Sequence, residues 1–154
     1  MPIPGARPAP PAVSRRGLSR PSPVELGAAV GDAPPLGTVL LVLAWGLVFG
    51  ALALRGGLDD TAAYVAWGAN ATGMANAETA WRLLASTFVH AGVAHVFFNA
   101  ASMAIYGPAV ERIFTRAGFA AVFAAGGVAA SLASLAWRAA RDPAGFSISV
   151  GASG

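Results

Sequence analysis

Two histidines and an asparagine open an otherwise apolar stretch of this sequence, His90-Ala-Gly-Val-Ala-His95-Val-Phe-Phe-Asn99. Within a bilayer, an imidazole or a carboxamide must find a partner inside the protein, because hydrocarbon offers none. On a helix, His95 and Asn99 are one turn apart and share a face, whereas His90 lies about 140° around the axis from His95. The spacing therefore predicts that His95 and Asn99 act together and that His90 has a separate role.

A serine stands between glycines in Gly151-Ala152-Ser153-Gly154. At the start of a helix, such a serine lies beside free backbone N–H groups, which favour a developing negative charge. Glycine on either side lets a substrate backbone or a neighbouring helix approach the hydroxyl. With His95 and Asn99, Ser153 gives the outline of an acyl-transfer site, a nucleophile with an oxyanion pocket. His95 suits a general base and a hydrogen-bond donor equally well, and Ser153 taken alone could be a helix cap or a packing position.

The composition is typical of a membrane protein. The 154 residues are 56% hydrophobic and 11% charged, whereas a soluble domain has about 25% charged residues. All ten basic residues are arginine, but they are scattered singly without an aromatic stacking platform, which argues against a nucleic-acid partner. The chain has no cysteine, so disulfides are excluded.

The amino-terminal third divides into a tail and a first transmembrane span. Residues 1–35 hold nine of the eleven prolines and four arginines, which predicts a disordered basic tail. Residues 36–54 carry no charge and are long enough to cross about 30 Å of hydrocarbon. A signal peptide is the alternative, because Ala51-Leu52-Ala53 resembles a cleavage site. The apolar run exceeds the usual ~7–15 residues, which favours a retained span.

A polar loop, residues 55–86, follows the first span. Loops of this length are usually functional or disordered. Tyr64, Trp67 and Trp81 are of the residue types that favour the membrane–water interface, so we expect them to hold this loop against the lipid headgroups.

Two further spans are predicted over residues 90–107 and 117–137, the first of them ended by Gly107-Pro108. Small residues four apart predict close helix packing in the third span. They are Gly126, Ala130 and Ser134, with Gly127 and Ser131 alongside. A fourth segment is expected to begin at about residue 150, and the end of the sequence within it predicts a truncated product.

Arginine counts predict the orientation. The tail and the 108–116 connector hold four and two arginines, against two each in the 55–86 and 138–149 loops. The richer side should be cytoplasmic, which places the amino terminus inside. The start of the second span and the start of the fourth segment then reach the same outer face, where the two histidines, Asn99 and Ser153 can meet.

Taken together, these motifs resemble the rhomboid family of intramembrane serine proteases. The resemblance covers roughly residues 36–154. It rests on Trp81-Arg82, on His90 followed by His95 and Asn99, on Gly107-Pro108 with Glu111-Arg112, and on Gly151-Ala152-Ser153-Gly154. It implies an all-α polytopic membrane fold, a six-helix bundle of which this chain supplies three complete transmembrane helices and the start of a fourth. It also implies a multi-pass protein of the bacterial inner membrane, with transmembrane substrates in the lipid bilayer and no metal or other cofactor.

The resemblance also implies roles for single residues. Ser153 would be the nucleophile, and His95 and Asn99 would donate to the oxyanion together with the Ser153 backbone N–H. Three further residues would support the site: His90, Gly151 and Gly154. Two pairs would be structural, Trp81 and Arg82 in the first loop, and Glu111 and Arg112 in the cytoplasmic connector.

The family's Ser–His dyad takes its base histidine from the sixth helix, whereas both histidines of this chain, His90 and His95, belong to the second span. We therefore expect this chain to lack the base and to be inactive as it stands. The alternative is a non-catalytic rhomboid-like protein that binds transmembrane clients, which downstream sequence would distinguish. A metal site at the two histidines is a third reading, opposed by their five-residue spacing and by the absence of a carboxylate or cysteine beside them.

Overall fold

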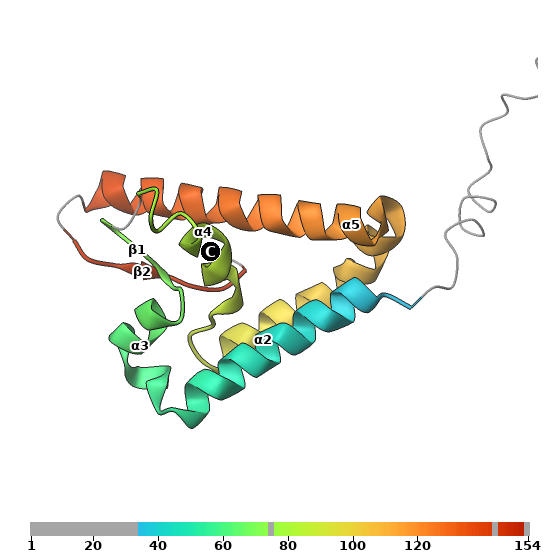
Figure 1. The fold of residues 1–154 in the computed structure, drawn as a ribbon, viewed down its shortest axis with the longest axis horizontal. Helices are drawn as coiled ribbons and strands as arrows, with labels where there is room; N and C mark the ends of the chain where they lie inside the picture. The colour runs from blue at the N-terminus through green and yellow to red at the C-terminus, as the bar shows by residue number, and fades with distance from the viewer. Residues whose placement is uncertain (1–33, 74–75, 143–144, 153–154) are drawn as a thin grey trace, which may run out of the picture. The chain divides into compact units, whose positions relative to one another are not determined.

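The computed structural model describes residues 34–73, 76–142 and 145–152, and it is mostly helical (Figure 1). Its elements in chain order are α2 (Leu36–Leu54), η2 (Gly57–Asp59), α3 (Thr61–Ala66), β1 (Asn70–Ala71), α4 (Arg82–Ala85), η3 (Ser86–Phe88), α5 (Val93–Arg141) and β2 (Ile148–Ser149). Among the described residues, α2 and α5 are long and apolar enough to cross a membrane. The predicted tail up to residue 33, and with it Ser153 and Gly154, lies outside the described residues.

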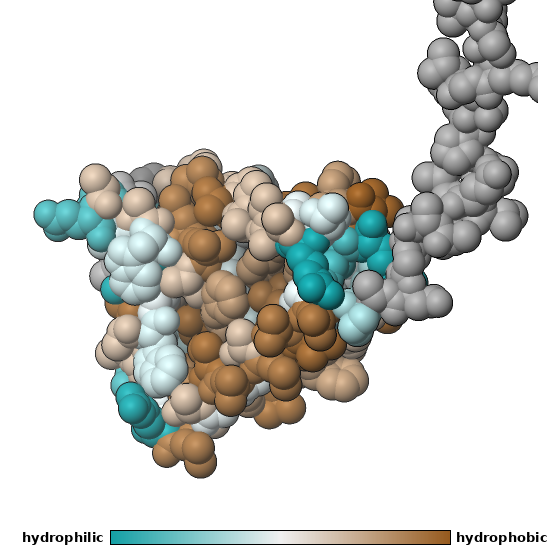
Figure 2. Space-filling view, turned by 45° about the vertical axis from the view of Figure 1, so that its right-hand side comes forward, coloured by the Kyte–Doolittle hydropathy of each residue, from teal (hydrophilic) through white to brown (hydrophobic). Residues whose placement is uncertain are grey.

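α2 covers the charge-free run of residues 36–54 and is apolar on every side. It buries Trp45 and Leu52, and it leaves Leu40, Leu43 and Leu47 exposed. A helix that is apolar all round is typical of a core or of a lipid-facing position. Figure 2 shows one face of the molecule, with apolar surface in its middle and hydrophilic side chains toward its two sides. This distribution fits a chain whose middle lies in hydrocarbon.

α5 consists of two helical arms joined at Thr115, where φ is 64° and ψ is 171°. Figure 1 shows the helix turning back on itself there. We call residues 93–114 the first arm and residues 116–141 the second arm. The backbone conformation of Thr115 is one that residues other than glycine rarely adopt. Its Oγ1 accepts the Gly118 N–H at 3.4 Å, as an N-cap does at the start of a new helix.

Gly107-Pro108 does not end the helix, contrary to the sequence-based expectation, and the helix begins at Val93 rather than at residue 90. Pro108 removes one helical hydrogen bond, but packing outweighs that loss. A Cβ built at Gly107 would lie 2.7 Å from the Thr38 side chain, so this glycine lets α2 approach the first arm closely. One turn later, Glu111 bonds to α2, which requires the helix to continue past the proline.

Glu111 caps the amino terminus of α2. Its carboxylate accepts the backbone N–H groups of Gly37 at 2.9 Å and Thr38 at 3.0 Å, and the Thr38 hydroxyl at 3.2 Å. The Arg116 guanidinium lies 3.6 Å from the same carboxylate. Unpaired N–H groups at a helix start carry partial positive charge, so a buried carboxylate there stabilises both partners. We call this region, with the Thr115 bend, the turn end; the exposed Arg112 takes no part in the network.

The second arm packs through Gly127 and Ser131 rather than through the neighbouring Gly126. A Cβ at Gly127 would meet the Thr87 side chain at 2.7 Å, whereas one at Gly126 would meet nothing within 4 Å. Ser131 Oγ donates to the Leu83 carbonyl at 2.8 Å. The predicted close packing exists, but its centre lies one residue further along the chain.

The described segments of residues 55–73, 76–92 and 145–152 lie at the other end of the helices, which we call the loop end (Figure 1). There β1 pairs antiparallel with β2, Asn70 opposite Ser149 and Ala71 opposite Ile148. The segment predicted to begin a fourth helix at about residue 150 is a strand and a turn as far as residue 152. The pairing fastens this segment to the first loop before it reaches the motif at residues 151–154.

Candidate active site

His95 and Asn99 lie one turn apart near the start of α5, and the backbone of Gly151 lies against both. A Cβ built at Gly151 would clash with His95 Cε1 and Nε2 and would lie 3.3 Å from Asn99 Nδ2. Gly151 has φ +87°, a conformation that glycine adopts without strain. Only glycine can bring the chain this close to the imidazole and the amide.

Hydrogen bonds on both sides hold the Gly151 segment in place. The Gly151 N–H donates to the Ser86 carbonyl at 2.8 Å, directly after α4. The Ser149 hydroxyl lies 3.2 Å from that of Ser134 on the second arm. Thr72 N–H donates to the Ser147 carbonyl at 3.0 Å and extends the β1–β2 pairing. The approach of Gly151 to the first arm is therefore fixed by contacts from three different parts of the chain.

His90 lies in the turn before α5 and is completely buried. Its ring stacks edge-to-face between Trp45 and His95, with ring centroids 5.3 Å and 5.1 Å away. His90 Nδ1 lies 3.3 Å from the Phe88 carbonyl oxygen, which favours the tautomer that carries its proton on Nδ1. Burial, assisted by the nearby His95, lowers the pKa of His90 to about 4, so its imidazole is neutral at pH 7.

Three buried polar atoms around this cluster have no hydrogen-bond partner among the residues that the structure describes. They are Trp45 Nε1, His90 Nε2 and Asn99 Nδ2. An unpaired buried donor or acceptor costs about 1–3 kcal/mol, so proteins rarely keep one without a role. Trp45 was not among the predicted site residues. Its position in the middle of an apolar span, away from the interface that tryptophan favours, was the available signal.

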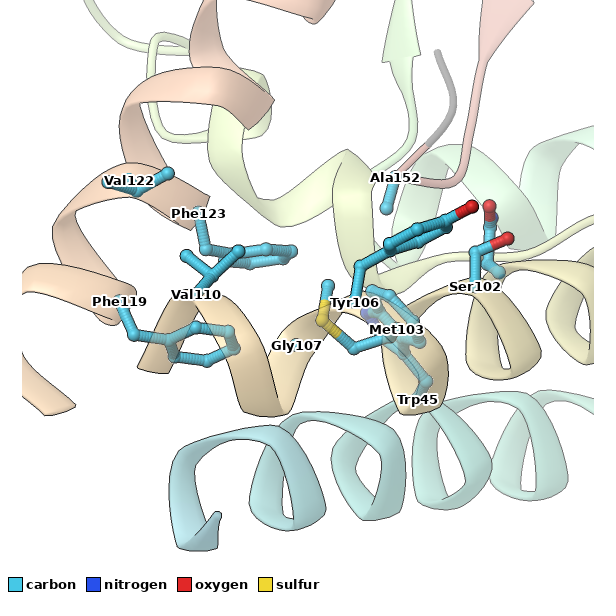
Figure 3. A pocket seen from close by; sticks show the side chains of 11 residues that line it. Trp45, Ser102, Met103, Tyr106, Gly107, Val110, Phe119, Val122, Phe123 and Ala152 are labelled. Atoms are coloured by element: carbon cyan, nitrogen blue, oxygen red, sulfur yellow. The ribbon is translucent and has the colours of Figure 1, made fainter. Parts of the chain in front are cut away.

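A cavity of about 270 Å³ opens beside Asn99 (Figure 3). Trp45 from α2, Tyr106 and Ser102 from the first arm, and Phe123 from the second arm line it, and Ala152 lies at its rim. Most of its wall is apolar. The polar cluster therefore borders a cavity that could hold an apolar side chain.

Trp81 and Arg82, the structural pair predicted in the first loop, lie beside the candidate active site rather than in it. The Arg82 guanidinium donates to the backbone carbonyls of Val65 and Ala69, the latter at 3.1 Å. It also lies 4.6 Å from the centre of the Trp81 ring. These contacts tie α4 to the end of α3 and so fix the loop that carries β1.

The structure thus brings four of the predicted site residues together: His90, His95, Asn99 and Gly151. The predicted nucleophile Ser153 and its neighbour Gly154 lie outside the described residues. Within the described ranges, no group of three or more histidine, cysteine, aspartate or glutamate side chains is arranged to hold a metal ion.

Comparison with known proteins agrees with the resemblance stated above. Residues 77–154 match the model of the Rhomboid domain family. The chain is 34% identical over 100 residues to "Rhomboid protease GluP" of Bacillus subtilis (strain 168), which covers 65% of this chain and 20% of that protein. It is 41% identical over 56 residues to "Putative rhomboid protease YdcA" of the same organism, covering 36% of this chain and 28% of the relative.

The chain thus spans between a fifth and a third of the length of these relatives. No solved structure matches it significantly. The family match covers half of the chain, including the His95–Asn99 pair and the Gly151 motif. Together with two helices that are long and apolar enough to cross a membrane, this match identifies a membrane protein. The chain belongs to the rhomboid family.

Proposed function

We propose that this chain supplies the nucleophile and the oxyanion side of a rhomboid-type intramembrane serine protease site. The observation that carries the proposal is the contact of Gly151 with His95 and Asn99. Two residues of extended chain span at most about 7 Å. Because Ser153 follows Gly151 by only two residues, we expect it to come within reach of both side chains.

In the proposed reaction, Ser153 Oγ attacks the scissile carbonyl of a transmembrane substrate. The new C–O bond turns the carbonyl oxygen into an oxyanion. The tetrahedral intermediate then collapses to the acyl-enzyme, the C–N bond breaks, and the amine leaves with the proton that the general base took from Ser153. Asn99 Nδ2, the His95 imidazole and the Ser153 N–H donate to the oxyanion, and such donors are worth about 10²–10³ each in rate. Water then releases the acyl group.

The serine proton must pass to a general base, and we assign neither histidine of this chain to that role. His90 is neutral and buried, with Nδ1 turned to the Phe88 carbonyl. His95 is assigned to the oxyanion. The resemblance places the base on a later helix, so residues 1–154 alone should cleave nothing. We further propose a bacterial inner-membrane location, with the amino terminus in the cytoplasm and the loop end outside.

Disulfide trapping tests the site directly, because the chain has no cysteine of its own. Cysteines at positions 99 and 153 should cross-link on mild oxidation in membranes. The pair at 70 and 149, opposite each other in the β1–β2 sheet, is the positive control. The pair at 126 and 153 is the negative control, because Gly126 faces open space. If 70–149 cross-links and 99–153 does not, Ser153 is not at this site.

An activity assay tests the missing base. Residues 1–154, reconstituted with a fluorogenic transmembrane substrate, should give no cleavage above that of Ser153→Ala. Cleavage that Ser153→Ala abolishes would show that His95 acts as the base and would overturn the assignment of His95 to the oxyanion.

A further inference from the structure

Arginines lie over the rings of several tryptophans at the loop end. The distances from guanidinium carbon to ring centre are 5.4 Å for Arg55–Trp67, 4.6 Å for Arg82–Trp81 and 4.8 Å for Arg141–Trp137. These three pairs stand where α2 ends, where α4 begins and where α5 ends. Tryptophan and arginine favour the depth of the lipid headgroups, so we expect these pairs to lie at that depth.

The Arg141–Trp137 pair differs from the others because it borders a hollow of about 220 Å³, with Arg138 and Phe146 on its wall. Trp137 is 63% exposed and Phe146 is 65% exposed. Arg138 is oriented by a hydrogen bond from its Nε to Ser134 Oγ at 3.3 Å. Two guanidinium groups and two aromatic rings therefore face one concave surface at the headgroup level.

Both guanidinium groups remain available for an anion. Within the described ranges, neither Arg138 nor Arg141 forms an ion pair with a carboxylate. Asp142 also lines the hollow, but a Cβ built at Gly145 would clash with its carboxylate, which is thus turned toward the Gly145 backbone. Arg82, by contrast, is bound to two backbone carbonyls.

We propose that this hollow binds the phosphate of an anionic glycerophospholipid such as phosphatidylglycerol. Guanidinium groups recognise phosphate through paired N–H donors, and each arginine near an anionic surface adds about fivefold in affinity. The exposed rings of Trp137 and Phe146 would flank the glycerol. The acyl chains would run along the second arm, where Leu132 is 50% exposed.

The same contacts would connect a bound headgroup to the candidate active site. Arg138 bonds to Ser134, and Ser134 bonds to Ser149 in β2, two residues before Gly151. A phosphate that holds Arg138 in place would steady this chain of hydrogen bonds. The lipid site itself does not depend on the proposed protease function.

Brominated lipids, which quench nearby tryptophan fluorescence, provide the test. The whole chain is reconstituted in phosphatidylcholine vesicles with increasing brominated phosphatidylglycerol or, in parallel, brominated phosphatidylcholine. Subtracting the signal of Trp137→Phe isolates quenching at Trp137. We expect brominated phosphatidylglycerol to quench Trp137 at a lower mole fraction than brominated phosphatidylcholine does. Arg141→Gln should raise its half-quenching mole fraction about fivefold.

Arg112→Gln is the matched control, since it removes one exposed arginine from the turn end. It should leave the half-quenching point unchanged, and circular dichroism should show unchanged helix content in both variants. Equal quenching by the two lipids, or an equal effect of Arg112→Gln, would overturn the proposal. Displacement of the brominated lipid by millimolar inorganic phosphate would also overturn it, because it would indicate a site for free anions.

Discussion

The turn end and the candidate active site of this protein treat polar side chains in opposite ways. At the turn end, the buried Glu111 carboxylate is saturated, since it accepts three hydrogen bonds from Gly37 and Thr38 and lies beside Arg116. Around the candidate active site, Trp45, His90 and Asn99 each keep a buried nitrogen without a partner in the described part of the chain.

The difference separates a structural from a chemical use of polarity. A saturated buried group stabilises the fold, because its desolvation is offset by charge-assisted hydrogen bonds. A buried polar group without a hydrogen-bond partner lowers stability, and it is useful only if a ligand or substrate supplies that partner. Four predictions test this contrast.

Glu111→Ala should cause the largest loss of stability. It leaves two backbone N–H groups of α2 without their acceptor, and removal of one partner from a buried charged network typically costs roughly 3–5 kcal/mol. The free energy of unfolding, measured by titration with SDS in mixed micelles, gives the comparison. Glu111→Gln keeps one acceptor oxygen and should lose about half as much. If Glu111→Ala were no less stable than Arg112→Ala, the carboxylate would not hold α2.

This network also explains why sequence reasoning misplaced the end of the helix. Gly107-Pro108 is the strongest local stop signal in the second apolar run, but Glu111 lies beyond it and must reach α2. A contact between residues 37 and 111 leaves no trace in local periodicity. The bend came instead at Thr115, a residue with no preference for that backbone conformation.

Features set by local sequence could be predicted, whereas features set by tertiary contacts could not. The limits of α2 follow from a charge-free run, and the shared face of His95 and Asn99 follows from helical spacing. Local sequence does not show which face of the second arm packs, because both of its sides are apolar. That Gly127 rather than Gly126 lies in the contact depends on tertiary packing. The two-residue strands β1 and β2 are too short to show an alternating pattern.

Acid should destabilise the fold through His90. In the unfolded chain His90 takes up a proton at the ordinary histidine pKa of about 6.5, whereas in the folded chain its pKa is about 4. Between these values the unfolded state binds more protons. The contribution of neutral His90 to the free energy of unfolding is therefore complete above pH 6.5, and about 3 kcal/mol of it is lost as the pH drops to 4. Unfolding measured from pH 7 to pH 4.5 should show this slope, and His90→Phe should flatten it. An equal slope in His90→Phe would assign the effect to other groups.

Gly151→Ala should cost about 2 kcal/mol, through its left-handed backbone and the clash with the His95 ring. Gly126→Ala is the matched control, because a Cβ there meets nothing and alanine favours a helix by up to ~1 kcal/mol. In each background, a cysteine introduced at position 149 reports on the segment by its reaction with maleimide. Faster labelling only in Gly151→Ala is expected. Equal labelling would mean that His95 and Asn99 do not constrain the segment.

Asn99→Leu should have the smallest effect and the opposite sign. Its amide nitrogen is buried and unpaired within the described residues, so replacing it with an apolar side chain of similar size should raise the free energy of unfolding by about 1 kcal/mol. The variant would at the same time lose a proposed oxyanion donor. A gain in stability would place Asn99 with the groups that are kept for chemistry. A loss as large as that of Glu111→Ala would place it with the structural groups instead, and the contrast between the turn end and the candidate active site would not hold.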